Sequence, residues 1–292
     1  MSHSHDRYPY SAIVDRPAYD WPGGRRLALY LGVNHEVFDF GGGMGPQLAP
    51  SQTEPDVMNY AWRDYGNRVG AWRLIGLFDR LTLRTTALLN ADVLDRCPGL
   101  AEACRDRGDE IVAHGGSNAK AQGSMFRPGE DRMIADVTDR LASLGVRPTG
   151  WLGPWISESR HTPDLLAKAG YRYVLDWAHD DQPTRLSTAH GGLLSVPYSQ
   201  EINDLPAIVA RHQEAEGFAG MIRDAVAQLL SECDRRPLVL GIALHPFIMG
   251  QAHRVPALAR VLTELREADD PRIWWTTAGE IAAHVEANGL AA

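Results

Sequence analysis

The stretch LYLGVNHE, Leu29–Glu36, decides the fold, because an apolar β-forming run leads directly into the polar residues Asn34, His35 and Glu36. The same succession recurs four times: EIVA before His114 and Asn118, YVL before Asp176, SVPYSQ before Glu201, Asn203 and Asp204, and GIAL before His245. In a parallel barrel the C-terminal ends of the strands meet on one face. The pattern therefore predicts that these polar side chains surround one mouth.

Short apolar segments alternate with amphipathic ones along the whole chain, which is typical of an α/β protein with a parallel sheet. We expect strands at Arg26–Val33, Arg84–Asn90, Glu110–His114, Thr149–Gly153, Arg172–Asp176, Leu193–Pro197, Leu238–His245 and Ile273–Thr276. We expect helices within Asn67–Leu81, Leu94–Arg107, Glu130–Leu144, Ala219–Glu232 and Pro256–Glu267. No linker divides the chain, so we predict one domain over residues 21–292 after a leader of residues 1–20.

Composition excludes several classes of function. A net charge of −8 with scattered basic residues disfavours a nucleic-acid partner. Three cysteines, Cys97, Cys104 and Cys233, are too few for a disulfide framework or a cysteine zinc site. The N-terminal residues lack the pattern of a signal peptide, and no apolar run approaches the ~20 residues of a membrane span. We therefore expect a cytoplasmic protein with no membrane partner.

Seven stretches, in order, resemble the polysaccharide-deacetylase (NodB-homology) superfamily. They are DYGNRVGAWRLIGLFDRL (64–81), DEIVAHGGSN (109–118), TGWLGPW (149–155), YRYVLDWAHDDQP (171–183), SVPYSQEIND (195–204), ALHPFIMGQAHR (243–254) and IWWTTAGEIAAH (273–284). Within that superfamily the chain is most similar to the branch of allantoinases and cyclic-imide hydrolases. The resemblance implies a single, distorted (β/α)7-type barrel.

The chain departs from the superfamily at the positions that hold a metal in its metal-dependent members. Asn34 stands where a ligand Asp is expected, and Asn118 replaces the second His of the His-x-x-x-His pair that begins at His114. Neutral amides are poor ligands for zinc. An arginine expected near Leu152 is also absent. We therefore expect no required cofactor and no metal ligands, with a divalent metal such as zinc at His114 as the alternative.

Three residues are the catalytic candidates: Glu36, His114 and His245. A carboxylate such as Glu36 deprotonates water when its environment permits, and an imidazole such as His245 protonates a leaving amine. The expected substrate contacts are Asn34, His35, Asn118, Trp155, Asp181, Glu201, Asn203 and Asp204. Backbone N–H groups near Gly115 and Gly116, or the amide of Asn118, are the expected donors to the oxyanion.

The resemblance and these residues together predict a hydrolase of carbon–nitrogen bonds other than peptide bonds, acting on a small linear or cyclic amide of the ureide or imide type. One alternative is an N-deacetylase of carbohydrate or peptidoglycan. The other is a catalytically inactive barrel that binds a small molecule. The resemblance also implies a homo-oligomer, a dimer or a tetramer, with the Asn67–Leu81 helix as a possible interface.

Overall fold

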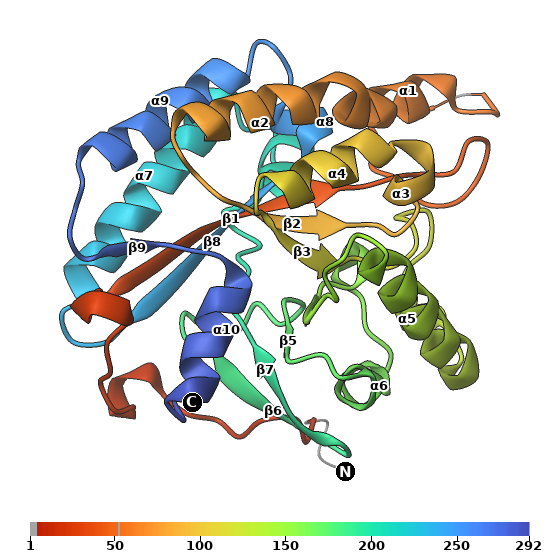
Figure 1. Cartoon of the computed structure of the whole chain (residues 1–292). Helices are drawn as coiled ribbons and strands as arrows, with labels where there is room; N and C mark the ends of the chain where they lie inside the picture. Colours follow the sequence, from red (N-terminus) through yellow and green to blue (C-terminus); the bar gives the residue numbers. More distant parts are fainter. Residues whose placement is uncertain (1–4, 52, 292) are drawn as a thin grey trace.

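A curled, mostly parallel sheet forms the centre of the computed structural model, which describes residues 5–51 and 53–291 (Figure 1). The strands follow the order β6-β7-β5-β4-β3-β2-β1-β8, and β9 pairs with β1. Their bounds are β1 Leu27–His35, β2 Thr86–Leu89, β3 Glu110–Ala113, β4 Gly150–Trp151, β5 Tyr173–Val174, β6 Thr184–Thr188, β7 Gly191–Ser195, β8 Leu238–Leu244 and β9 Ile273–Trp275. Among the strand pairs of these described residues, only β6–β7 is antiparallel. The α/β barrel class is thereby confirmed.

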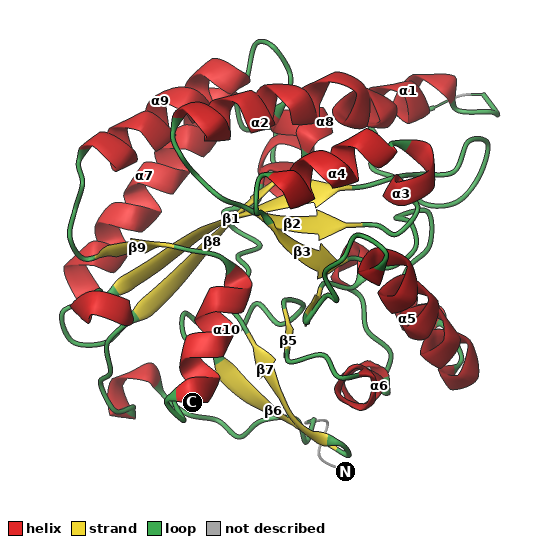
Figure 2. Ribbon diagram, in the orientation of Figure 1, coloured by secondary structure: helices red, strands yellow, loops and turns green. Residues whose placement is uncertain are grey.

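Helices surround the outside of the sheet (Figure 2). Their bounds are α1 Val57–Tyr65, a π-helical segment Gly66–Gly70, α2 Ala71–Arg80, α3 Val93–Arg96, α4 Pro98–Asp106, α5 Arg127–Ala142, α6 Thr162–Ala169, α7 Ala215–Glu232, α8 Pro246–Met249, α9 Val255–Glu267 and α10 Ala278–Ala287. A second π-helical segment is Leu205–Ala210. None of the helices in the described part of the chain combines the length and apolarity needed to cross a bilayer.

Each of the eight expected strands coincides with a strand of the structure, but several elements were not predicted. Strand β6 and helices α1, α6, α8 and α10 fall outside the expected ranges. Two of these helices carry recognisable end signals. The Thr277 side chain accepts a hydrogen bond from the Glu280 N–H at the start of α10, as in a capping box, and α6 ends at Gly170 with a φ of 89°.

The barrel closes through irregular segments rather than through a strand pair. Along the free edge of β8, the N–H of Val239 donates to the carbonyl of Asp181 at 2.9 Å, and the N–H of Ala243 donates to the carbonyl of Ile202 at 3.0 Å. These bonds satisfy backbone groups that an open sheet edge would leave unpaired. The segments that follow β5 and β7 are thereby held beside β8.

Alternation along β1 separates the interior of the barrel from its helical shell. Leu27, Leu29, Leu31 and Val33 pack outward in the cluster that includes α2, α7 and α9. The intervening positions face inward, where Tyr30 joins a second cluster with residues of β2, β3, β5 and β8. Period-two alternation is what a strand buried on both faces requires.

Three buried tyrosines fill the barrel interior, each lying against a glycine of a neighbouring strand. A Cβ added to the glycine would lie 2.5 Å from the Tyr30 ring at Gly241, 2.0 Å from the Tyr173 ring at Gly150 and 2.9 Å from the Tyr198 ring at Gly32. The glycines thus leave the space that the phenol rings occupy.

The described part of the leader is bound to the barrel. Arg7 pairs with Asp164 at 2.9 Å and Arg16 pairs with Asp180 at 2.6 Å. The Tyr8 ring stacks on His179 with 4.1 Å between the ring centroids. These contacts place residues 5–16 against α6 and the segment after β5.

Replacement of Gly241 by alanine tests the packing of the interior. We expect G241A to lower the free energy of unfolding by about 1–3 kcal/mol, because the added methyl group overpacks the site against Tyr30. The matched control is G220A in α7, where an added Cβ meets nothing within 4 Å; removing a helical glycine there should be neutral or stabilising by up to ~1 kcal/mol. Urea unfolding of both variants makes the comparison, and equal stability of G241A and wild type would contradict this packing.

Candidate active site

A cavity of about 170 Å³ opens where the strands end at their C-terminal side. Its lining residues are Asn34, Glu36, Pro46, His114, Asn118, Leu152, Trp155, Ile156, Tyr198, Gln200, Asn203, Leu205, Pro206 and His245. Asn34, His114 and His245 lie at or just after the ends of β1, β3 and β8, so the strand ends bring them together. Of the polar residues expected to surround one mouth, six line this cavity, namely Asn34, Glu36, His114, Asn118, Asn203 and His245, whereas His35, Asp176, Glu201 and Asp204 do not.

The Glu36 carboxylate lies at the centre of the polar groups. Its Oε1 accepts a hydrogen bond from Asn118 Nδ2 at 2.5 Å, and it lies 3.3 Å from His114 Nε2 and 3.7 Å from His245 Nε2. His114 Nδ1 is 2.8 Å from the Leu152 carbonyl, to which it donates. His114 Nε2 is therefore the ring nitrogen left to face the carboxylate. Glu36 is only 5% exposed, so these contacts are shielded from bulk water.

Asn90 fixes the direction in which the Asn118 amide points. Asn90 Oδ1 accepts from the Val37 N–H at 2.9 Å, and its Nδ2 donates to the His114 carbonyl and, at 2.9 Å, to Asn118 Oδ1. Backbone groups have one hydrogen-bonding sense each, so they determine which end of the Asn90 amide is the donor. The oxygen of Asn118 consequently faces Asn90, and its N–H faces Glu36.

His245 is held by Asp204, the second residue of the Asn203–Asp204 pair. Asp204 Oδ1 lies 2.6 Å from His245 Nδ1, and Asp204 Oδ2 accepts from the His245 N–H at 2.8 Å. Burial alone would lower the pKa of His245, but the negative charges of Asp204 and Glu36 outweigh it and raise that pKa above its ordinary value. Asp204 is fully buried and does not line the cavity, so it acts on the site through His245.

Other expected substrate contacts shape the cavity wall. Trp155 adopts a positive φ of 61°, and its Nε1 donates to the Asn118 carbonyl at 2.8 Å. Asn34 Nδ2 donates to the Tyr198 hydroxyl at 2.8 Å and to the Leu244 carbonyl at 3.2 Å. Asn203 Oδ1 accepts from the Leu205 N–H at 3.0 Å. Trp155 and Asn34 are thus held by hydrogen bonds to other segments, and Asn203 by a bond within its own turn.

Four expected substrate contacts lie outside this cavity: Asp204, which holds His245 from behind, and His35, Asp181 and Glu201. Alternation along β1 turns His35 away from the interior, and its Nε2 lies 3.6 Å from the thiol of Cys104 in α4. Burial lowers the pKa of His35 to about 4, so this ring is neutral near physiological pH. Asp181 and Glu201 line a neighbouring hollow along the barrel seam, where Glu201 pairs with Arg211.

Three residues of the site were not predicted from the sequence: Asn90, Tyr198 and Gln200. Asn90 is the last residue of an expected strand. It could have been predicted as a site residue, because polar side chains at strand ends were expected to face the mouth. Tyr198 and Gln200 lie within the quoted stretch SVPYSQ and line the cavity. Gln200 Nε2 is buried without a hydrogen-bond partner in the described structure.

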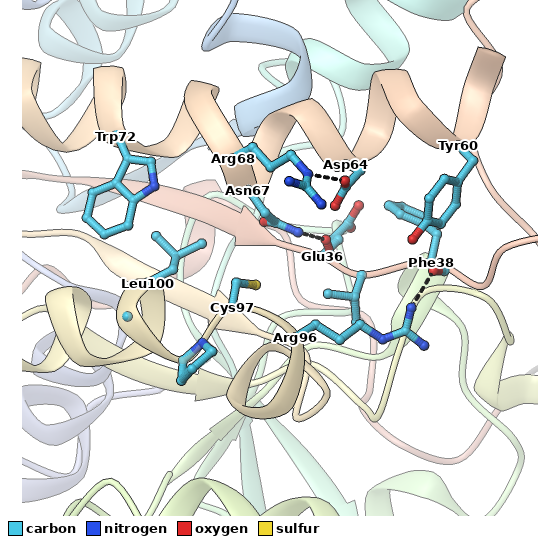
Figure 3. A pocket seen from close by; sticks show the side chains of 13 residues that line it. Glu36, Phe38, Tyr60, Asp64, Asn67, Arg68, Trp72, Arg96, Cys97 and Leu100 are labelled. Carbon is cyan, nitrogen blue, oxygen red and sulfur yellow. Dashed lines mark hydrogen bonds and ion pairs between the residues drawn. The ribbon is translucent and has the colours of Figure 1, made fainter. Parts of the chain in front are cut away.

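A second cavity of about 250 Å³ lies on the other side of Glu36, between the helices of the shell (Figure 3). No histidine lines it, and its charged side chains are engaged: Arg68 pairs with Asp64, and Arg96 donates to the Phe38 carbonyl. Burial raises the pKa of the Cys97 thiol to about 11, so it is not a ready nucleophile. The chemistry of a hydrolase is therefore better served by the histidine-lined cavity, to which we refer below as the active-site cavity.

The donor set does not fit the transition metal that metal-dependent members of the superfamily hold. Asn34 and Asn118 stand at two of the three ligand positions, and both turn an N–H group, not an oxygen, toward their neighbours in the site. An amide N–H is a donor and cannot ligate a cation. Within the described residues, no three His, Cys, Asp or Glu side chains are grouped so as to hold a metal ion.

No family model matches the chain. Individual known proteins are nevertheless similar to it in sequence and in fold. A Schizosaccharomyces pombe protein named as a polysaccharide deacetylase is 23% identical over 280 residues, which are 89% of this chain and 85% of that protein. The PuuE allantoinase structure matches with a TM-score of 0.84 and 26% identity, over 96% of this chain and 98% of that one. A Pseudomonas aeruginosa PAO1 protein, also named as a polysaccharide deacetylase, matches with the same TM-score of 0.84, 26% identity and 96% and 98% coverage.

The likeness extends over nearly the whole chain, and it agrees with the barrel fold. Allantoinases and deacetylases both hydrolyse carbon–nitrogen bonds that are not peptide bonds. In sequence and in fold the chain is similar to members of the polysaccharide-deacetylase (NodB-homology) superfamily, and these relatives support a hydrolase of such bonds.

Proposed function

We propose that the protein hydrolyses the amide bond of a small, neutral, linear or cyclic amide of the ureide or imide type, as the allantoinase-like branch does, and that it needs no metal. The observation that carries the proposal is the placement of Glu36 within reach of two imidazoles, one of them braced by Asp204. A base and an acid at one cavity are the two groups that amide hydrolysis requires.

The proposed base is Glu36 and the proposed acid is His245. Glu36 takes a proton from water, the water oxygen adds to the carbonyl carbon, and His245 Nε2 protonates the nitrogen as the C–N bond breaks. Glu36 then returns its proton to His245 across the 3.7 Å contact, which restores both groups. The Asn118 N–H holds the carboxyl group in place beside His114.

The lining of the active-site cavity supports a neutral substrate. It contains no lysine or arginine, and its polar groups outside Glu36 and the histidines are amides and a phenol. A substrate carboxylate or phosphate would meet no lysine or arginine there and would lie close to the Glu36 carboxylate. Flat carbonyl and amide groups, by contrast, match the Asn and Gln side chains and the Trp155 ring.

An N-deacetylase of sugar polymers is the second candidate function, favoured by the names of two of the relatives. A panel of allantoin, succinimide and di-N-acetylchitobiose separates the two functions. Release of acetate from di-N-acetylchitobiose alone would favour the deacetylase, and turnover of either cyclic compound favours the proposed function.

Further proposals concern location and assembly. We propose a cytoplasmic protein with one barrel domain, residues 21–292, after a leader of residues 1–20.

We also propose that copies associate through the helix around Asn67–Leu81, because Trp72 in α2 is 46% exposed. Light scattering of W72E against wild type tests this: we expect a dimer or tetramer for wild type and a smaller species for the variant, and an unchanged mass would contradict the interface.

Removing the proposed base or acid should abolish most of the turnover. We expect E36Q and H245A each to lower kcat by on the order of 10²-fold or more, the usual scale for loss of a general base or acid. E201Q is the matched control, because the Glu201 carboxylate pairs with Arg211 outside the active-site cavity. Full activity of E36Q on a panel substrate would show that another group is the base.

The Asp204 charge should set the alkaline limit of activity. His245 must be protonated to act as the acid, so the rate falls as pH rises through its pKa. Because Asp204 raises that pKa, D204N should shift the alkaline limb of the kcat profile to lower pH. D181N, at a carboxylate outside the active-site cavity, is the control and should leave the limb unmoved. An alkaline limb unchanged in D204N would exclude His245 as the titrating acid.

A further inference from the structure

The hydrogen bonds of the active-site cavity leave open the question of what binds the substrate's carbonyl oxygen. The donors expected from the sequence are not available. The N–H group of Asn118 that faces the site is engaged by Glu36, and neither Gly115 nor Gly116 lines the cavity. As Glu36 takes the proton from water, the negative charge passes to the carbonyl oxygen, and the oxyanion needs another donor to hold that charge.

The Tyr198 hydroxyl is such a donor. Its oxygen accepts a hydrogen bond from Asn34 Nδ2, and the same nitrogen also donates to the Leu244 carbonyl. A carbonyl oxygen can only accept, so this end of the Asn34 amide is fixed as the donor. The Tyr198 oxygen is therefore the acceptor in its bond with Asn34, and the phenolic proton is turned elsewhere. No hydrogen bond between described residues uses that proton.

Packing holds this hydroxyl in place. The Tyr198 ring is 1% exposed and lies against Gly32 of β1, where even a Cβ would lie 2.9 Å from the ring. Burial, together with the charge of Glu36, raises the pKa of Tyr198 well above its ordinary value, so the phenol keeps its proton at neutral pH. A rigid, protonated donor needs little reorganisation as charge develops in the transition state.

We propose that Tyr198 is a further catalytic residue, whose hydroxyl donates a hydrogen bond to the carbonyl oxygen of the scissile amide and holds the oxyanion formed from it. The inference rests on the proposed amide hydrolysis. As the water oxygen bonds to the carbonyl carbon, the π pair moves onto the carbonyl oxygen, and the phenolic proton stays on Tyr198. The pair then reforms the C=O bond, the C–N pair leaves with nitrogen, and His245 supplies the proton that nitrogen takes.

Replacing oxygen by sulfur in the substrate separates this role from a structural one. The probes are the fastest substrate among allantoin, succinimide and di-N-acetylchitobiose, and its analogue with sulfur at the scissile carbonyl, because sulfur is a poor hydrogen-bond acceptor. We expect Y198F to lower kcat on the oxygen substrate by about 10²–10³-fold with little change in KM, the scale for loss of one oxyanion donor. The factor by which Y198F lowers kcat on the sulfur analogue should be at least ~10-fold smaller, because in wild type the hydrogen bond from Tyr198 to sulfur is already weak.

Y171F is the matched control, because the Tyr171 hydroxyl contacts Thr138 in the helical shell, outside the cavity; both of its rates should equal those of wild type. Equal losses by Y198F on both probes, or no loss, would overturn the inference. If Y198F does not fold, 3-fluorotyrosine at position 198 keeps the ring and makes the phenol a stronger donor. The ratio of the oxygen to the sulfur rate should then rise, and an unchanged ratio would contradict the role.

The two proposals fail in different ways. If wild type hydrolyses no amide of the panel, the proposed function is wrong and Tyr198 has no oxyanion to bind. If wild type is active and E36Q is not, while Y198F behaves as wild type on both probes, only the role of Tyr198 is wrong.

Discussion

Alternation along the buried strands is the constraint on which the active site depends. Side chains of a strand point in turn to the two faces of the sheet, and β1 is buried on both faces. Asn34 and Glu36 therefore face the interior together, while His35 between them packs against the helical shell. The same rule turns His114 and His245 inward from β3 and β8. A shift of one residue in the register of β1 would remove the carboxylate from both histidines.

The direction of the hydrogen bonds then determines which end of each asparagine amide faces Glu36 or Tyr198. Backbone groups orient Asn90, Asn90 orients Asn118, and Asn118 presents an N–H to Glu36. A position that holds a metal ligand in the metal-dependent relatives thus supplies a donor that holds a carboxylate. Asn118 and Asn34 position Glu36 and Tyr198, and in the proposed mechanism the proton transfers fall on side chains.

Much of the fold and part of the site follow from the sequence. The eight expected strands are present because apolar runs bounded by polar residues and glycines leave few alternatives. His114, Asn118, Asn203 and His245 line the cavity as expected, since the ends of parallel strands converge. Asp181 and Glu201 lie instead on irregular segments along the seam with β8, and local sequence does not determine the direction of a loop side chain. His35 could have been placed correctly by applying the period of two within β1.

The central claim is that side chains alone carry both proton transfers of amide hydrolysis. It is tested most directly by the turnover of the panel amides before and after exhaustive removal of metal by a chelator, with zinc then added back and metal content measured at each stage. We expect at least one small neutral amide to be hydrolysed at the same kcat by metal-free protein, with no gain on addition of zinc. Loss of turnover on chelation and its recovery with one equivalent of zinc would contradict the account.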